Sequence, residues 1–403
     1  MSVKKISDFE FISLMASLMA IASLSLDAIL PALNNIGLSI GITDPKDNQL
    51  LITTIFLGMG VGQLISGALS DSLGRKPVVY IGYIIFAIAS VVCVCAVNLE
   101  MMVAGRLLQG VGLSAPRSVT MSIVRDKYEG NYMARIMSFV SVIFILVPIV
   151  APFFGKLMLD AFGWQSIFYS QIIFGFCVMV WLWRRQEETL TDENKKKVTL
   201  SLFTDGVREF FKHREAVIYT IVIGIVTAPF LSYISSSQQI FQEQYNLVEE
   251  YTYIFSGLAI VIGVATYLNG ILVLRLGMLR LVMLSLVLLS MTSLVYVICY
   301  SGVGNPPIMV LVAFLSLILF STGFIVGNIN ALAMQPIGHI AGIGAAIVGF
   351  ISTIITILLT TIIGQYINMT ALPIFIGFTI CGSVTLFVVL VMNRSKNVIV
   401  TNS

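Results

Sequence analysis

Three charged residues lie inside apolar stretches, where an ordinary membrane helix carries none. Asp27 falls within the apolar run 9–33 and is the only acidic residue well inside such a run, whereas Arg106 and Arg117 fall within the run 100–124. A charge in hydrocarbon costs several kcal/mol unless it is paired, neutralised or hydrated. A carboxyl group that binds and releases a proton near a basic group is typical of proton- or cation-coupled transport.

Asp27 and Arg106 lie at matching depths if the N-terminus is cytoplasmic. Each is about six residues from the outer end of its helix, so at ~1.5 Å per residue both lie about 9 Å below the outer surface of the apolar layer. A nearby arginine favours the charged carboxylate and apolar surroundings favour the neutral acid, so the group can titrate. We predict that Asp27 is the proton site and that its protonation frees Arg106 or the substrate; a static ion pair is the alternative.

Arg117 follows Arg106 by eleven residues. This spacing is three helical turns plus about 20°, so both arginines share one helix face with Gly110. We expect this face to meet an aqueous cavity in which Arg117 attracts polar or anionic substrates. The alternative is that Arg117 lies near the inner mouth of the cavity, where it snorkels or pairs with Asp126.

The composition requires lipid as the solvent for this chain. Of 403 residues, 58% are hydrophobic and 11% are charged, and the mean hydropathy is +0.97; a soluble domain carries about 25% charged residues. The net charge of +3 is too small and too scattered for nucleic-acid binding. The five cysteines lie in apolar runs and the two histidines stand far apart, so we expect no metal and no cofactor. An intramembrane enzyme would need a nucleophile–base pair at membrane depth, and the sequence offers none, so we expect no enzyme.

Apolar runs of spanning length predict an all-α membrane protein with twelve transmembrane helices. Barrel strands would be shorter and would alternate in polarity, so a β-barrel is excluded. The runs are 9–33, 48–69, 78–97, 100–124, 135–158, 164–184, 216–241, 252–273, 280–299, 308–332, 342–364 and 371–392.

The basic residues orient these helices. With the N-terminus inside, nineteen of the 23 Lys and Arg residues fall in inner segments, and only Lys46 and Lys156 fall in outer loops. This bias predicts a multi-pass membrane protein with both termini cytoplasmic. The first run is too long for a signal peptide and has no clear cleavage site, so we expect an uncleaved helix.

The charged middle of the chain divides it into two halves. We predict an N-terminal six-helix bundle at 1–184, a cytoplasmic linker at 185–214 that includes an amphipathic segment at 201–214, and a C-terminal six-helix bundle at 215–403. The pattern Gly67-x-Leu69-x-x-x-Leu73-Gly74 recurs as Gly270-x-Leu272-x-x-x-Leu276-Gly277, about half a chain later. Such parallel repeats are typical of twelve-helix transporters that rock about a central site.

Three motifs resemble signatures of the major facilitator superfamily. Residues 67–77 resemble its loop signature between the second and third helices, and Arg106-Leu-Leu-Gln109-Gly110-Val-Gly112 resembles its fourth-helix signature. The prolines and glycine Pro148, Pro152 and Gly155 resemble its fifth-helix antiporter motif, although Ala151 stands where a glycine is usual.

Further stretches resemble the bicyclomycin/chloramphenicol-resistance group of bacterial drug:proton antiporters. They are 26–32, 124–126 and 336–342. The resemblance covers the whole chain. It implies a proton-coupled antiporter of the bacterial inner membrane that exports small amphipathic drugs such as amphenicols by alternating access. Export or import of a metabolite, such as a siderophore or a peptide-like compound, is the alternative.

The resemblance also assigns roles in the loop motif. Gly67 and Gly74 permit close helix approach and a tight turn. Asp71 caps a helix of the C-terminal half, and Arg75 and Lys76 complete a latch between the halves. Their alternative role is to anchor the topology. In the fifth helix, Pro148, Pro152 and Gly155 are expected to form a kink, which is either part of the rocking motion or a packing bend.

The substrate cavity has weaker candidates. We predict that Arg117 lines this cavity together with two apolar residues of the N-terminal half and neutral polar or aromatic residues of the C-terminal half. These residues are Phe56, Met59, Tyr233, Gln238, Gln239, Asn328 and Asn330. Such residues more often join helices than bind ligand. The expected partners are a small-molecule substrate, protons and membrane lipid, and the expected state is a monomer.

Overall fold

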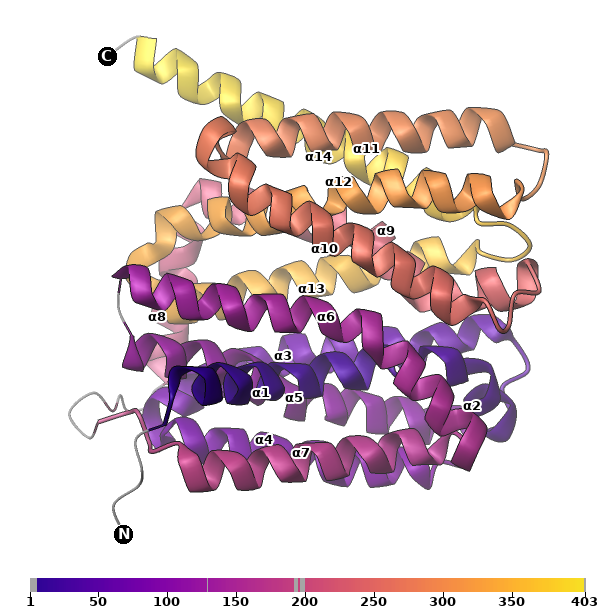
Figure 1. The fold of residues 1–403 in the computed structure, drawn as a ribbon. Coiled ribbons are helices and arrows are strands. Elements are labelled where there is room, and N and C mark those ends of the chain that lie inside the picture. Colours follow the sequence, from indigo (N-terminus) through magenta and orange to yellow (C-terminus); the bar gives the residue numbers. More distant parts are fainter. Residues whose placement is uncertain (1–5, 129, 192–194, 196–199, 402–403) are drawn as a thin grey trace. The chain divides into compact units, whose positions relative to one another are not determined.

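The computed structural model describes residues 6–128, 130–191, 195 and 200–401. Most of these residues lie in helices (Figure 1). Lys4, Lys5, Lys196 and Lys197, which contribute to the orientation prediction, lie outside the described residues. The chain divides into two compact units: unit 1 is Met1–Arg208 with Ala345–Phe350, and unit 2 is Glu209–Gly344 with Ile351–Ser403.

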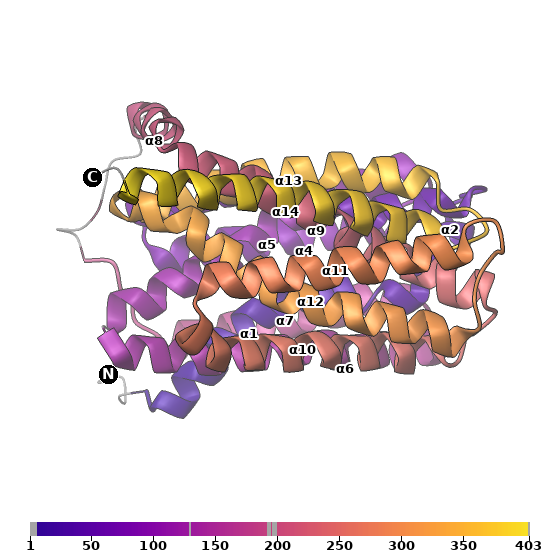
Figure 2. The same ribbon diagram turned by 90° about the horizontal axis from the view of Figure 1, so that it is seen from above.

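Unit 1 contains the first six long helical segments, and the helices lie side by side along a common direction (Figures 1 and 2). The elements are α1 (Asp8–Asp27), η1 (Leu30–Ala32), α2 (Leu33–Ser39), η2 (Pro45–Gln49), α3 (Leu50–Leu73), α4 (Arg75–Val94), α5 (Leu99–Lys127), α6 (Gly130–Phe162) and α7 (Gln165–Arg185). Helix α5 packs against α3 and α4, and α1 packs against α5, α6 and α7. Phe11, Leu14 and Met15 of α1 are fully buried in this core.

The six further long helices of the described chain lie in unit 2, except that residues Ala345–Phe350 of α13 belong to unit 1. They are α9 (Arg214–Gln238), extended by the π-helical η4 (Gln239–Gln244), then α10 (Tyr251–Leu276), α11 (Met278–Tyr300), α12 (Ile308–Met334), extended by η5 (Gln335–Ile340), α13 (Ala341–Gln365) and α14 (Leu372–Thr401). Helix α11 packs against α12 and α14, and α9 packs against the same two helices.

These elements confirm the twelve-helix prediction. Ten described segments are long and apolar enough to cross a membrane, and α5 and α6, which contain 29 and 33 residues, supply the other two long helices. Many large apolar side chains of the long helices remain exposed, for example Leu274, Leu284 and Trp183. This exposure is expected of a surface that meets lipid rather than water.

The repeated glycine motif forms the same turn in both units. Gly74 separates α3 from α4 with φ +108°, and Gly277 separates α10 from α11 with φ +78°. These backbone angles are strained for residues with a Cβ, so glycine is required at both turns. A Cβ added at Gly67 would meet nothing within 4 Å, so the close approach expected at this glycine is not seen.

The predicted amphipathic segment is helical. It forms α8 (Leu200–Lys212), which begins after part of the chain outside the described residues. Phe210 is fully buried, whereas Val207 and Phe211 are exposed. The side chains of residues 200–203 lie outside the described set.

Candidate functional site

Asp27 is the last residue of α1 and is buried, with 8% of its surface exposed. The helix ends here because Pro31 follows in η1 and offers no backbone N–H for a further helical turn. No ion pair or hydrogen bond of the Asp27 carboxyl group is present among the described residues. A buried carboxyl group without partners is more stable in its neutral, protonated form.

Arg106 lies on α5 and is completely buried. Its Nε donates to the Leu51 carbonyl oxygen at 2.8 Å, and its two terminal nitrogens donate to the Ser25 carbonyl oxygen at 3.2 and 3.3 Å. Nη1 also donates to Gln109 Oε1 at 2.8 Å, and Gln109 in turn donates to Ser90 Oγ at 2.7 Å. One guanidinium thereby links α1, α3 and α5, and the Gln109 amide extends the network to α4.

The structure brings Arg106 to the end of α1 but not into an ion pair with Asp27. Arg106 binds the carbonyl of Ser25, two residues before Asp27 in the chain. A cation at a helix C-terminus is favoured because the last carbonyl groups carry partial negative charge. Arg106 therefore lies near the end of α1, in agreement with the matching depths predicted from the sequence. Its guanidinium binds the Ser25 carbonyl group and not the Asp27 carboxyl group.

Gly155 of α6 packs against the residue that follows Asp27. A Cβ at Gly155 would lie 2.7 Å from the carbonyl carbon of Ala28 and closer still to its oxygen. The antiporter-like motif therefore reaches the proton-site candidate through backbone contact between α6 and the end of α1. Pro148 and Pro152 lie inside α6, and Figure 1 shows that α6 bends in its second half, as prolines predict.

The expected polar face of α5 is only partly exposed. Gly110 is buried because its missing side chain lets α3 approach, and a Cβ there would collide with the Ile55 carbonyl oxygen. Arg106 is buried as well. The expectation that the whole face meets a cavity is wrong for Arg106 and Gly110, because neighbouring helices pack against this part of the face.

Arg117, further along α5, is exposed. Its guanidinium has no ion pair or hydrogen bond within the described parts of the chain. The alternative pairing with Asp126 is not seen, because Asp126 binds Arg75 Nε at 2.8 Å. An unpaired arginine inside a spanning helix is costly in lipid, so contact with water or an anionic ligand is the favourable arrangement.

The loop motif forms a charged cluster at the turn between α3 and α4. Arg75 is buried and donates to Asp71, to Ser70 Oγ at 2.9 Å and to Asp126 at 2.8 Å. Asp126 also accepts from the Thr189 hydroxyl at 3.1 Å. The buried guanidinium is thus balanced by two carboxylates, as a buried charge requires.

Glu188 caps the N-terminus of α4. Its carboxylate accepts from the backbone N–H groups of Arg75 and Lys76 at 2.9 Å each, and from those of Thr189 and Leu190 at 2.9 and 3.0 Å. A carboxylate at a helix N-terminus satisfies free N–H groups and meets the positive end of the helix dipole. Sequence reasoning missed this role, because Glu188 stands there only as one residue of a charged run.

Lys76 adds a further contact to the start of the linker. Its Nζ donates to the Gln186 carbonyl oxygen at 2.5 Å. A cavity of about 340 Å³ lies beside the cluster and is lined by Asp71, Arg75, Arg125, Asp126, Thr189, Leu190 and Thr191. The loop motif and the first linker residues are therefore joined by hydrogen bonds.

The apolar cavity candidates of unit 1 pack with its core. Met59 is buried with 5% of its surface exposed, and Phe56 is half-buried against the same core. In unit 2, Tyr233 is buried and stacks on Phe255 with ring centroids 6.3 Å apart. The Tyr233 hydroxyl has no hydrogen-bond partner among the described residues.

The amide candidates of unit 2 mostly join neighbouring segments. Gln238 Nε2 donates to Gln242 Oε1 at 3.0 Å, and Gln239 Nε2 donates to the Ile367 carbonyl oxygen at 3.3 Å. Asn328 of α12 donates to Asn269 of α10 at 2.7 Å. The contacts of Gln239 and Asn328 match the helix-joining alternative, whereas Gln238 bonds within its own helical segment. The remaining candidate, Asn330, is exposed.

Comparison with known proteins identifies the family. The model of the Major Facilitator Superfamily matches residues 13–360. The chain belongs to this superfamily of membrane transporters. A solved structure of a D-xylose–proton symporter shares the fold, with a TM-score of 0.74 at 13% identity over 95% of this chain and 96% of that one.

Two bacterial relatives agree with the predicted resemblance. An uncharacterised transporter of the superfamily from Bacillus subtilis, YdgK, is 27% identical over 87% of each chain. A bicyclomycin resistance protein homolog from Haemophilus influenzae is 25% identical over 67% of this chain and 68% of its own length. The match to the family model confirms the family prediction made from the motifs. The drug-resistance name of the second relative agrees with the group that the motifs resemble.

Proposed function

We propose that this transporter is a proton-coupled antiporter of the bacterial inner membrane that exports small amphipathic drugs such as amphenicols by alternating access. The observation that carries the proposal is the buried Asp27 carboxyl group, which has no hydrogen-bond partner in the described part of the chain. The resistance name of the Haemophilus influenzae relative supports a drug as the substrate.

The coupling follows from the cost of a buried charge. Asp27 is stable as a neutral acid in its present surroundings and needs water, a cation or a substrate cation when it ionises. A conformation that hydrates Asp27 therefore favours proton release, and a conformation that buries it favours proton binding. Each proton that enters down a membrane potential supplies about 2.3 kcal/mol per 100 mV for export.

The test is substrate-driven proton flux in liposomes. Purified protein is reconstituted with a pH-sensitive dye inside, a proton gradient is imposed, and chloramphenicol or florfenicol is added. Drug-dependent flux that is present in the wild type and absent in Asp27→Asn is the expected result. Intact coupled flux in Asp27→Asn contradicts the role of Asp27 as the proton site.

A metabolite substrate is the second candidate. The exposed and unpaired Arg117 favours a polar or anionic compound over a neutral drug. No drug-dependent flux in the wild type, followed by proton flux with a carboxylate-bearing siderophore or peptide, would favour this candidate over drug export.

A further inference from the structure

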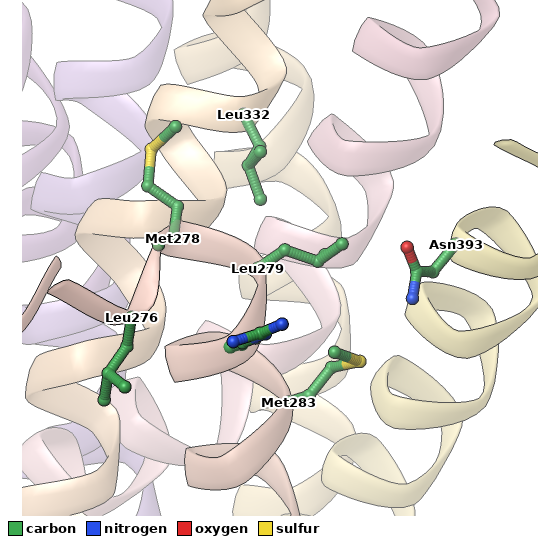
Figure 3. A pocket seen from close by; sticks show the side chains of 8 residues that line it. Leu276, Met278, Leu279, Met283, Leu332 and Asn393 are labelled. Carbon is green, nitrogen blue, oxygen red and sulfur yellow. The ribbon is translucent and has the colours of Figure 1, made fainter. Parts of the chain in front are cut away.

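A cavity lies at the turn that joins α10 to α11 in unit 2. Its volume is about 500 Å³, and its lining residues are Leu276, Gly277, Met278, Leu279, Arg280, Met283, Leu332 and Asn393. Figure 3 shows that the Leu279 and Asn393 side chains, from α11 and α14, point toward one another. Residues of α10, α11, α12 and α14 and the glycine turn of the same unit therefore build this cavity.

The charge in this cavity has no counterpart in the chain around it. Arg280 is exposed and makes no ion pair or hydrogen bond within the described residues. Residues 251–403 contain the four basic residues Arg275, Arg280, Arg394 and Lys396, and they contain no Asp or Glu at all. The rest of this 153-residue stretch thus offers Arg280 no carboxylate.

The equivalent turn of unit 1 is neutralised by the protein itself. There Arg75 meets Asp71 and Asp126, and Glu188 caps the first N–H groups of α4. The turn of unit 2 has the same glycine conformation at Gly277, but no side chain of the described residues accepts a hydrogen bond from the first N–H groups of α11. One copy of the repeat therefore supplies its own anions, and the other presents a cation and a helix N-terminus beside a cavity.

The surroundings of the cavity are suited to lipid. Leu274 and Leu284, on either side of the turn, expose 88% and 62% of their surfaces. The lining itself is mostly Leu and Met. The distribution of basic residues places this turn on the cytoplasmic side, where the leaflet is rich in anionic lipids and basic pockets between helices bind their headgroups.

We propose that the turn between α10 and α11 is a binding site for an anionic phospholipid, with Arg280 on the phosphate and the acyl chains along the exposed leucines of α10 and α11. A phospholipid fits better than a free phosphate because the one cation of the lining stands among leucine and methionine side chains, and the leucines of the flanking helices are exposed. This site is independent of proton coupling through Asp27.

The test compares lipid binding to the purified, delipidated full-length protein by native mass spectrometry. Phosphatidylglycerol and phosphatidylcholine with identical acyl chains are titrated, and the wild type is expected to prefer phosphatidylglycerol. Arg280→Gln should weaken phosphatidylglycerol binding about fivefold, since one interfacial arginine contributes about this much. Arg275→Gln is the matched control, because it removes the same charge from the same turn but outside the cavity lining.

Two further variants separate the site from a general charge effect. Arg280→Lys keeps the charge and should retain most of the preference. Met283→Trp keeps Arg280 but fills the cavity, and should weaken binding as Arg280→Gln does. Equal effects of Arg280→Gln and Arg275→Gln, no preference in the wild type, or displacement of phosphatidylglycerol by millimolar inorganic phosphate would each overturn the proposal.

Discussion

At the scale of single residues, Arg106 and Asp27 have different energetic roles. Arg106 is fully buried, and its donors are shared among the carbonyl groups of Ser25 and Leu51 and the side chain of Gln109. Arg106→Gln should lower the free energy of unfolding by roughly 3 kcal/mol or more, because several charge-assisted hydrogen bonds are lost and buried carbonyl groups are left without a donor. Thermal unfolding in detergent measures this loss.

Asp27→Asn is the matched comparison for that experiment. The amide has nearly the volume of the carboxyl group, and Asp27 has no partner to lose among the described residues. Its melting temperature should stay close to that of the wild type even though coupled flux is lost. A strong destabilisation by Asp27→Asn would instead indicate a structural ion pair in the ensemble.

The sequence predicted this pair of residues but not their contacts. Counting residues from the helix ends placed Asp27 and Arg106 at one depth, because helical rise is fixed. The Ser25 carbonyl, which Arg106 binds, is freed by the way α1 ends, and a backbone group carries no signal in the residue type. Gly110 was likewise assigned to the right face, but which neighbour covers that face depends on packing.

At the scale of elements, Glu188 connects the linker to the turn between α3 and α4. Glu188→Gln keeps an acceptor oxygen but removes the charge that meets the α4 N-terminus. We expect a loss of about 1 kcal/mol in stability, with a slower transport rate because Arg75 is held less firmly. Thermal unfolding and liposome flux measure the two effects.

The neighbouring Glu187→Gln is the control for Glu188→Gln. It removes the same charge at an exposed position of the same segment, and the Glu187 carboxylate caps no helix in the described structure. Equal effects of the two substitutions would show that overall linker charge matters, and that the cap does not. Helix positions in this region were predictable from apolar runs, whereas the cap was not, because its two sides lie about 110 residues apart.

The contact between α6 and α1 gives a second prediction for elements. Gly155→Ala places a methyl group against the Ala28 carbonyl and forces α6 away from the end of α1. Overpacking of this kind costs about 1–3 kcal/mol and should also reduce coupled flux, because Ala28 directly follows Asp27 in the chain. Gly257→Ala on α10, where a Cβ meets nothing within 4 Å, should be neutral or slightly stabilising in the same unfolding and flux measurements. Normal flux and stability in Gly155→Ala would show that α6 and the end of α1 can move apart at little cost, and would contradict the prediction.

At the scale of the whole molecule, the distribution of charge predicts its orientation. Two of the 23 basic residues lie in loops assigned to the outside, and an even number of helices places both ends of the chain on one side. Asp44, in the loop between α2 and α3, should therefore face the periplasm, and Glu187 should face the cytoplasm. In a cysteine-free background, Asp44→Cys should react with a membrane-impermeant maleimide from the periplasmic side, whereas Glu187→Cys should react only after the inner membrane is permeabilised. The reverse labelling pattern would show that the molecule has the opposite orientation. Asp27, the charged turn between α3 and α4 and the proposed lipid site would then each lie nearer the wrong side of the membrane for the roles proposed for them.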